Sequence, residues 1–257
     1  MTVLRLLAIL RRSMMLSSSR EIKPVVPEND SRLIVSDIAY PSGMGSVRAH
    51  FARPKGDIRL PGVVVIHENR GLVPHIKDVA RRVALEGFLA IAPDALSPVG
   101  GTPEDVTDVS TLIQKLDREA TIKTFVAAAK YLKTHPQSTG KVGVMGFCWG
   151  GGMANQIAVN SSDLDAAVSF YGMQPASEDV LKIRASLLLH YAGNDERINQ
   201  GIAAYEAALK KAHVEYKLYM YPGVEHAFFN DTSPRYNPEA AKKAWERTIS
   251  FFKQKLA

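Results

Sequence analysis

The chain has 257 residues, of which 46% are hydrophobic and 23% are charged. This is the composition of a folded globular protein, and it excludes a disordered or fibrous one. A chain of this length buries about three quarters of the surface of its unfolded state, so one large domain is favoured over two small ones.

A single cysteine, Cys148, excludes an internal disulfide and any metal site that needs a pair of cysteines. The formal net charge of +6 would suit an anionic macromolecule as partner. The basic residues, however, are spread along the chain beside acidic ones, and no basic stretch is interleaved with aromatic residues. We therefore expect a solvated surface and no nucleic-acid partner.

Residues 1–30 are expected to form an N-terminal extension, either disordered or the remnant of a leader. Their longest apolar run, Leu6–Leu10, is too short for the core of a secretory signal or for a membrane span. Arg11-Arg12 suit a twin-arginine signal, but only Met14–Leu16 follow before a serine cluster. We expect a cytoplasmic protein without a membrane span, with export to the periplasm or an organelle left open.

Strand patterns begin after this extension. Residues 32–40 and 46–52 alternate apolar and polar side chains on either side of Pro41-Ser-Gly-Met-Gly45. This alternation is typical of a half-exposed antiparallel hairpin. We expect the hairpin to form one edge of a sheet.

From Gly62 onward, uninterrupted apolar strands alternate with helices. The expected strands lie at 63–66, 88–92, 142–145, 166–170, 186–191 and 215–221, and the expected helices at 75–86, 104–116, 118–134, from 149, 200–212 and 238–255. Strands that are apolar on both sides and separated by helices require a parallel sheet covered on both faces. The predicted fold class is α/β: residues 31–257 form a single α/β-hydrolase domain with a mostly parallel central sheet.

The lone cysteine lies in Gly146-Phe-Cys-Trp-Gly150, between a predicted strand and the helix that starts at Trp149. A nucleophile flanked by glycines at such a place is typical of a nucleophile elbow, because the glycines allow the turn that lifts the side chain above the sheet. A helix N-terminus beside a thiol also favours the thiolate. The alternative is an inert, buried cysteine beside a tight turn.

An acid and a histidine follow Cys148 in the order that α/β-hydrolases use. Asp195 lies in the turn after a predicted strand, where it can orient an imidazole, although an aspartate there can also be only a turn former. His226 lies in the loop after the following strand, whereas the two other histidines beyond Cys148 lie in a strand and at a helix end.

The loop His67-Glu-Asn-Arg-Gly71 follows the first buried strand and is expected at the same edge of the sheet. In this fold, a loop after an early strand supplies one backbone amide of the oxyanion hole. The backbone N–H groups of Asn69 and Trp149 are therefore predicted to stabilise a developing oxyanion.

From about Ser31 onward the chain resembles the dienelactone hydrolase family, the cysteine-dependent branch of the α/β-hydrolases. The matching segments are His67-Glu-Asn-Arg-Gly71, Ala92-Pro-Asp94, Gly146-Phe-Cys-Trp-Gly-Gly151, Phe170-Tyr-Gly172, the turn of Asp195 and Pro222-Gly-Val-Glu-His-Ala-Phe228. The resemblance implies that Cys148 is the nucleophile, His226 the base and Asp195 the acid that orients it. It also implies that Glu68 contacts the resting thiol and helps to generate the thiolate when substrate binds.

The physical interpretation of Glu68 agrees only in part with this role, because a carboxylate beside a thiol raises the pKa of the thiol. Glu68 then suits a gate that protects the thiol until substrate displaces the carboxylate. The alternative is a loop carboxylate paired with Arg70.

Two segments depart from the family pattern. Family members that act on dienelactone bind its carboxylate with two arginines, one shortly after the Pro-Asp match and one shortly after the histidine. Here these segments read Asp94-Ala-Leu-Ser-Pro-Val-Gly-Gly101 and His226-Ala-Phe-Phe-Asn-Asp231, without an arginine. The chain is therefore similar to a subgroup that lacks this clamp, and Arg70 and Arg235 are the candidate substitutes.

The predicted function is hydrolysis of an ester or lactone bond of a small molecule by a Cys-His-Asp triad, without a metal or organic cofactor, by a monomer or homodimer. One alternative is thioester hydrolysis or acyl transfer at the same site. Another is a non-catalytic relative that binds a small ligand or uses the lone thiol as a redox sensor.

Overall fold

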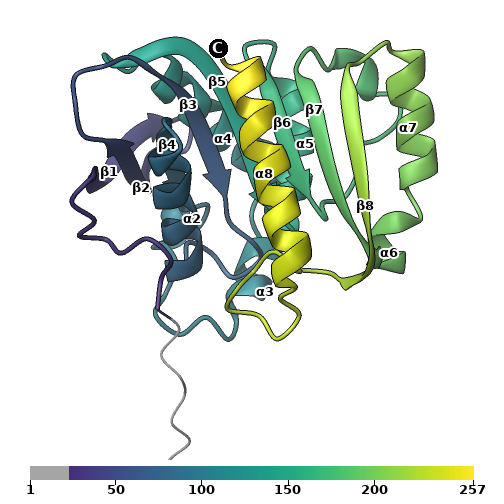
Figure 1. Ribbon diagram of the computed structural model, residues 1–257, viewed down its shortest axis with the longest axis horizontal. Helices are drawn as coiled ribbons and strands as arrows, with labels where there is room; N and C mark the ends of the chain where they lie inside the picture. Colours follow the sequence, from purple (N-terminus) through teal and green to yellow (C-terminus); the bar gives the residue numbers. More distant parts are fainter. Residues whose placement is uncertain (1–22) are drawn as a thin grey trace, which may run out of the picture.

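The computed structural model describes residues 23–257, and the first 22 residues of the leader or disordered extension expected over residues 1–30 lie outside this range. One eight-stranded sheet crosses the molecule and is covered by helices on both faces (Figure 1). In spatial order the strands are β1 (Leu33–Ser42), β2 (Gly45–Pro54), β4 (Leu89–Pro93), β3 (Leu60–Ile66), β5 (Ser138–Phe147), β6 (Ala166–Phe170), β7 (Ser186–Asn194) and β8 (Tyr216–Glu225).

The predicted fold class is confirmed. Strands β1 and β2 form an antiparallel hairpin at one edge, and β2 pairs antiparallel with β4. All further pairs, from β4 and β3 through to β8, are parallel. The carboxyl ends of six strands therefore meet at one edge of the sheet, where an α/β fold places its site.

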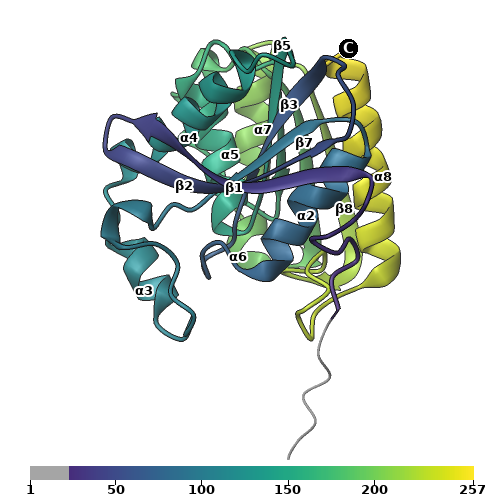
Figure 2. The same cartoon turned by 90° about the vertical axis from the view of Figure 1, so that its left-hand side faces the viewer.

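The helices form two layers, one on each side of the sheet (Figure 2). On one side lie α2 (Pro74–Leu85) and α8 (Pro238–Lys255), and on the other lie α4 (Arg118–Lys133), α5 (Trp149–Asn160) and α7 (Ile202–Lys211). Short elements are α3 (Val109–Gln114), α6 (Glu196–Asn199) and the 3-10 turns η1 (Ser97–Val99) and η2 (Val180–Lys182).

Strand β3 is apolar along its whole length because it has a core on either side. In β3, Val63 and Val65 pack in the core beneath α2 and α8, whereas Val64 and Ile66 pack in the core beneath α4 and α5. All four side chains are fully buried. The uninterrupted run of β-branched residues thus reflects burial on both faces of a parallel strand.

The prediction of one helix over 104–116 is wrong in its first half, since α3 begins only at Val109. The carboxylate of Asp105 accepts hydrogen bonds from the backbone N–H and the hydroxyl of Thr107, at 3.0 and 2.6 Å. Such a local turn competes with the helical hydrogen bonds of the same residues.

The packed part of the chain begins a few residues before the boundary predicted at residue 31. The N–H groups of Val25 and Val26 donate to the carboxylate of Asp78 in α2, at 3.0 and 2.8 Å. The guanidinium of Arg81 donates to the carbonyl of Val26 at 2.7 Å, and the Val26 side chain is buried. Helix α2 thus fixes this segment on its surface.

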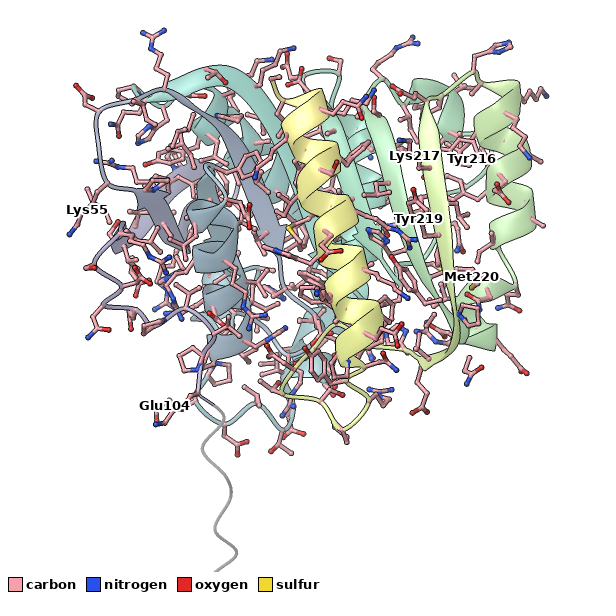
Figure 3. All side chains as sticks on the ribbon, viewed as in Figure 1. Lys55, Glu104, Tyr216, Lys217, Tyr219 and Met220 are labelled. Carbon is pink, nitrogen blue, oxygen red and sulfur yellow. The ribbon has the colours of Figure 1, made fainter. Side chains whose placement is uncertain are left out.

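The far edge of the sheet is strand β8, where Lys217 and Met220 are exposed and Tyr216 and Tyr219 are half-buried (Figure 3). The guanidinium of Arg247 in α8 stacks over the ring of Tyr219, 3.8 Å from its centroid. A lysine on an edge strand hinders pairing with a second sheet. Within residues 23–257, no helix combines the length and the apolar character needed to cross a bilayer.

Candidate active site

Cys148 occupies the sharp turn between β5 and α5, with φ 56° and ψ −115°. A residue with a side chain rarely adopts this conformation, and its cost is of the order of 1–3 kcal/mol. The backbone N–H of Cys148 donates to the carbonyl of Phe170 at 3.0 Å, and its carbonyl accepts from Gly152 at 3.1 Å. The neighbouring strand and the first turn of α5 together hold the strained residue in place.

The glycines of the predicted elbow are required by close packing of the backbone. A Cβ atom on Gly146 would lie 2.0 Å from the carbonyl oxygen of Gly150, and one on Gly150 would lie 2.4 Å from the carbonyl oxygen of His67. The left-handed φ itself belongs to Cys148. The glycines therefore permit the approach of helix to strand, while the nucleophile candidate carries the strain.

Asp195 and His226 are brought together by the register of β7 and β8. Asn194 and Glu225 are paired across these strands, so the residue after each lies at the carboxyl edge beside the other. Nδ1 of His226 lies 2.5 Å from Oδ2 of Asp195. Because an ionised carboxylate only accepts hydrogen bonds, Nδ1–H is the donor, and in the neutral imidazole Nε2 then carries the lone pair.

Nε2 of His226 is buried and has no hydrogen-bond partner among the residues that the structure describes. The imidazole ring packs against the ring of Tyr171, with 4.8 Å between the centroids. Tyr171 follows Phe170, the register partner of Phe147, and so lies beside Cys148 at the sheet edge. Nε2 of His226 and the thiol of Cys148 thus both lie beside Tyr171, at the same edge of the sheet.

Backbone strain concentrates at this edge of the sheet. Within residues 23–257, the non-glycine residues with positive φ are Cys148, Tyr171, His213 and Ala227. Cys148 and Tyr171 lie at the site, and Ala227 directly follows His226. Such strain persists only where the surroundings determine the conformation, and it is common at active sites.

Glu68 lies at the end of β3 with a buried carboxylate. Oε2 accepts a hydrogen bond from the side-chain amide of Asn230 at 2.6 Å, and Oε1 accepts one from the hydroxyl of Tyr171 at 3.5 Å. Burial first, and then the charge of Glu68, raise the pKa of Tyr171, which keeps its hydroxyl protonated as a donor. Neither partner is Arg70, the ion-pair partner considered from the sequence.

The loop that carries Glu68 is fixed by His67. Nδ1 of His67 donates to the carbonyl of Glu68 at 2.6 Å, and Nε2 accepts from the N–H of Ala95 at 3.2 Å. The Trp149 ring stacks on this imidazole with 5.3 Å between centroids. Burial lowers the pKa of His67, so the ring stays neutral and can donate at one nitrogen while it accepts at the other.

The segment Ala92-Pro-Asp94 supports the same loop from the next strand. The carboxylate of Asp94 accepts from the N–H and the hydroxyl of Thr102, at 2.7 and 2.8 Å. The hydroxyl oxygen of Thr102 in turn accepts from the N–H of Leu72 at 2.8 Å. Asp94 therefore has a structural role: through Thr102 it holds two loops of the site together.

The resting thiol of Cys148 is neutral. Burial first, and then the charge of Glu68, raise its pKa to about 11. A hydrogen bond from the N–H of Trp149 and the charge of Arg197 act in the opposite direction. The predicted support for thiolate from the start of α5 is present, but burial and the neighbouring carboxylate outweigh it.

A cavity of about 610 Å³ opens over Cys148. Asn69 and Trp149, the predicted oxyanion donors, both line it. Arg70 and Arg235 are not among its lining residues, although Arg235 lies near enough to Tyr171 to lower the pKa of that hydroxyl.

The arginines that do line the cavity, Arg118 and Arg197, were not identified from the sequence. Nothing in the sequence around Arg118 marks it as a cavity residue, because a basic residue at the start of a helix looks like any other exposed residue. Arg197 lies two residues beyond Asp195, and this proximity was the one available indication.

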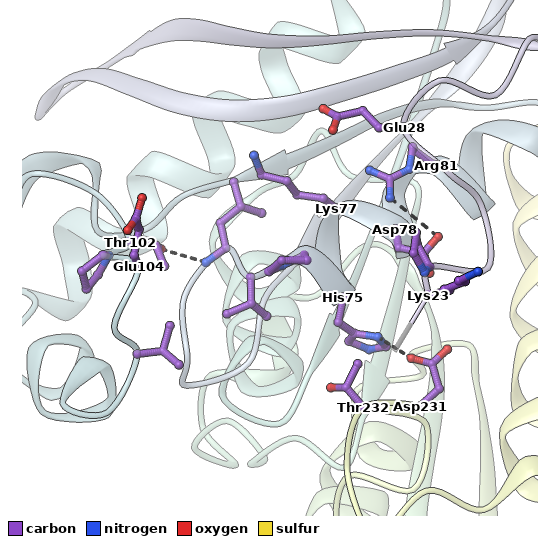
Figure 4. A pocket seen from close by; sticks show the side chains of 16 residues that line it. Lys23, Glu28, His75, Lys77, Asp78, Arg81, Thr102, Glu104, Asp231 and Thr232 are labelled. Atoms are coloured by element: carbon purple, nitrogen blue, oxygen red, sulfur yellow. Dashed lines mark hydrogen bonds and ion pairs between the residues drawn. The ribbon is translucent and has the colours of Figure 1, made fainter. Parts of the chain in front are cut away.

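A second cavity, of about 600 Å³, lies beside α2 and does not include Cys148 (Figure 4). Two of its acids have partners: Nδ1 of His75 lies 2.9 Å from Asp231, and Arg82, outside the cavity lining, bridges the carboxylates of Asp231 and Asp78. These ion pairs link the segment that follows β8 to α2, and so support the loop of His226.

Comparison with known proteins gives concordant results. The profile of the dienelactone hydrolase family matches residues 47–256. A protein of Saccharolobus solfataricus named "Putative carboxymethylenebutenolidase" is 34% identical over 256 residues, which cover 85% of this chain and 98% of the relative. A protein of the same name from Escherichia coli K12 is 31% identical over 246 residues, or 90% of each chain.

Solved structures show the same fold. A crystal structure from Klebsiella pneumoniae, described as "Putative Dienelactone Hydrolase", has a TM-score of 0.80 at 28% identity and covers 86% of this chain and 99% of its own. The dienelactone hydrolase-like promiscuous phosphotriesterase P91 from metagenomic libraries has a TM-score of 0.78 at 26% identity, covering 88% of this chain and all of its own.

Proposed function

Because the chain belongs to the dienelactone hydrolase family, we propose that it cleaves ester or lactone bonds of small molecules through a triad of Cys148, His226 and Asp195. Family membership makes the protein a hydrolase of such bonds. The residues that perform the chemistry, and their roles, are our proposal.

One observation carries this proposal. The pair of His226 and Asp195 leaves a buried, unpartnered Nε2 in the same group of side chains as the strained elbow of Cys148. A nucleophile, a base and a third group that orients the base are the elements of covalent catalysis of acyl transfer.

In the proposed reaction, the thiol proton moves to Nε2 of His226, and the sulfur attacks the carbonyl carbon. The N–H groups of Asn69 and Trp149 stabilise the oxyanion. When the intermediate collapses, the C–O bond breaks and His226 returns the proton to the leaving oxygen. A water molecule, deprotonated by His226, then attacks the thioester, and the C–S bond breaks to restore the thiol.

Glu68 acts as the gate of this site in our proposal. Its charge raises the pKa of the resting thiol, which protects the sulfur from oxidation and alkylation while no substrate is bound. Entry of a substrate moves the carboxylate away from its partners Tyr171 and Asn230, and so weakens its effect on the ionisation of the thiol.

The experiment is a comparison of Cys148→Ala, His226→Ala and Asp195→Asn with the parent protein on a panel of p-nitrophenyl esters, lactones and acyl thioesters. We expect kcat/KM on the preferred ester to fall by at least about 10³-fold in each variant. A slowly hydrolysed ester should add the mass of its acyl group to Cys148 in the parent protein. His213→Asn, remote from the site and at a residue with φ 55°, is the matched histidine control.

Turnover at the parental rate in Cys148→Ala and His226→Ala would show that the triad is wrongly assigned. Preference for thioesters over oxygen esters, or transfer of the acyl group to an added alcohol, would keep the triad but change the reaction.

A further inference from the structure

The cavity above Cys148 has a one-sided charge. Among the residues that the structure describes, its charged lining residues are Arg118 and Arg197, and no aspartate or glutamate lines it. The remaining lining is apolar or carries uncharged amides and hydroxyls, as in Gln114, Ser110 and Thr121. A cavity with cations and no acids favours a ligand of negative charge.

Neither arginine is neutralised by the protein in the described part of the chain. The arginines that form salt bridges there are Arg32, Arg81 and Arg82, and Arg118 and Arg197 form none. Two cations that line one cavity without counter-ions attract an anion to it.

The acids on either side of Arg118 have other partners, whereas Glu196, which directly precedes Arg197, is exposed and forms no salt bridge in the described part of the chain. Asp117 accepts a hydrogen bond from the N–H of Ala120 at 2.7 Å and caps α4, and Glu119 pairs with Lys123 at 2.6 Å. Asp195, two residues before Arg197, is bound to His226. Arg118 is also the first residue of α4, where a cation opposes the helix dipole and gains nothing from the helix.

Both arginines belong to the outer part of the cavity, because both are exposed whereas Cys148 is half-buried. Arg197 is close enough for its charge to act on Cys148. An anionic group bound by these guanidiniums would therefore extend from the reacting carbonyl toward the cavity mouth.

We infer that the substrate carries an anionic group, a carboxylate or a phosphate, away from the scissile carbonyl, and that Arg118 and Arg197 bind this group at the mouth of the cavity. This inference rests on the proposed function. It differs from the carboxylate clamp of the family, since the segments 94–101 and 226–231 that hold the clamp arginines contain none here. Asn230, in the second segment, binds Glu68 instead.

The experiment compares esters that differ by one charge. The p-nitrophenyl monoester of adipic acid carries a carboxylate at the end of its acyl chain, and p-nitrophenyl hexanoate is its neutral counterpart. In the same way, 4-acetoxybenzoate and 4-acetoxybenzamide place or omit the charge on the leaving group. The readout is the ratio of kcat/KM for the charged ester to that for the neutral ester, because an effect on the thiol itself cancels in this ratio.

In the parent protein we expect this ratio to exceed 1 for one of the two pairs, which then identifies the side of the substrate that carries the charge. Arg118→Gln and Arg197→Gln should each lower the ratio about fivefold to tenfold, chiefly through KM. Raising the ionic strength to about 1 M should also lower it, because the arginines are exposed and screened. Arg184→Gln, at an exposed arginine outside the cavity, should leave the ratio unchanged.

The double variant Arg118→Gln/Arg197→Gln must still turn over the neutral esters for the comparison to count. If its ratios then equal those of the parent protein for both pairs of esters, the inference is overturned. Failure of the proposed function has a different signature: no ester of either charge is hydrolysed, or Cys148→Ala hydrolyses them all. Addition of inorganic phosphate as a competitor separates the two anions, because a phosphate site should show inhibition that Arg197→Gln weakens.

Discussion

Asn230 donates its side-chain amide to Oε2 of Glu68 across 2.6 Å, and this amide has only one favourable orientation. Its Oδ1 atom accepts from the backbone N–H of Thr232 at 2.9 Å and from the hydroxyl of Thr232 at 2.6 Å. The amide NH₂ group must therefore face the carboxylate. A neutral donor thus fixes Glu68 and leaves its charge available to act on Cys148.

We expect Asn230→Ala to lower the free energy of unfolding by about 1–3 kcal/mol, because it leaves a buried carboxylate oxygen without its donor. Thr232→Val keeps the backbone N–H but removes the hydroxyl, and should cost less, about 0.5–1.5 kcal/mol. Urea denaturation gives both values. Asn160→Ala, at an exposed asparagine in α5, is the control and should change stability by no more than about 0.5 kcal/mol. Equal losses for Asn230→Ala and Asn160→Ala would refute the part given to Asn230.

A second prediction concerns the thiol itself. Burial is the larger cause of the raised pKa of Cys148 and Glu68 the smaller, so Glu68→Gln should lower this pKa from about 11 without returning it to the ordinary value. Below its pKa the thiolate fraction changes roughly tenfold per unit of pKa shift. The rate of alkylation by iodoacetamide at pH 8 should therefore rise in Glu68→Gln. The control is Glu239→Gln, at an exposed position in α8, which should be alkylated at the parental rate. A parental rate in Glu68→Gln as well would show that the carboxylate does not act on the sulfur.

The sequence was sufficient for the features that depend on local pattern. Strand β6 lies at 166–170 and α8 at 238–255, as predicted, because an apolar run and a Pro-initiated amphipathic segment mark them directly. Cys148, Asp195 and His226 were likewise predicted to follow parallel strands, here β5, β7 and β8, and the register of the sheet brings them to one edge.

The contacts made by pairs of distant loops could not be predicted in this way. Glu68 and Asn230 are 162 positions apart, and the amide that binds the carboxylate has no signature of its own in the sequence. The same holds for Arg118 and Arg197, which share a cavity only because α4 and α6 both begin at the carboxyl edge. The expectation for Arg70 and Arg235 relied on nearness in sequence to motif residues, which does not determine where a long side chain lies.

The start of α5 offers a matched pair of glycines. A Cβ atom on Gly151 would lie 2.5 Å from the carbonyl oxygen of Phe170, whereas one on Gly152 would lie no closer than 3.5 Å to any atom outside its own helix turn. The backbone of β6 cannot move without disturbing the sheet, so Gly151→Ala should lower the free energy of unfolding by about 1–3 kcal/mol. Gly152→Ala should be neutral or stabilising by up to about 1 kcal/mol, since alanine favours a helix. Thermal denaturation of both variants checks the prediction, and similar midpoints would contradict it.

The last prediction concerns His190, which is buried in β7. Nε2 lies 3.1 Å from the hydroxyl of Thr248, and Nδ1 lies 2.9 Å from the hydroxyl of Tyr221. Burial first, and then the charge of Arg247, lower the pKa of His190 to about 3. The unfolded chain therefore binds a proton more readily than the folded protein does.

The sign of the pH effect follows from this difference. The contribution of His190 to stability is fully present above the unfolded pKa of about 6.5, and it is lost as the pH falls from there toward the folded pKa, at up to about 1.4 kcal/mol per pH unit. In His190→Gln the free energy of unfolding, measured by urea denaturation between pH 7 and pH 4, should fall less steeply than in the parent protein. Carboxylates that titrate in this range affect both proteins alike, so parallel curves would show that His190 is not the group responsible.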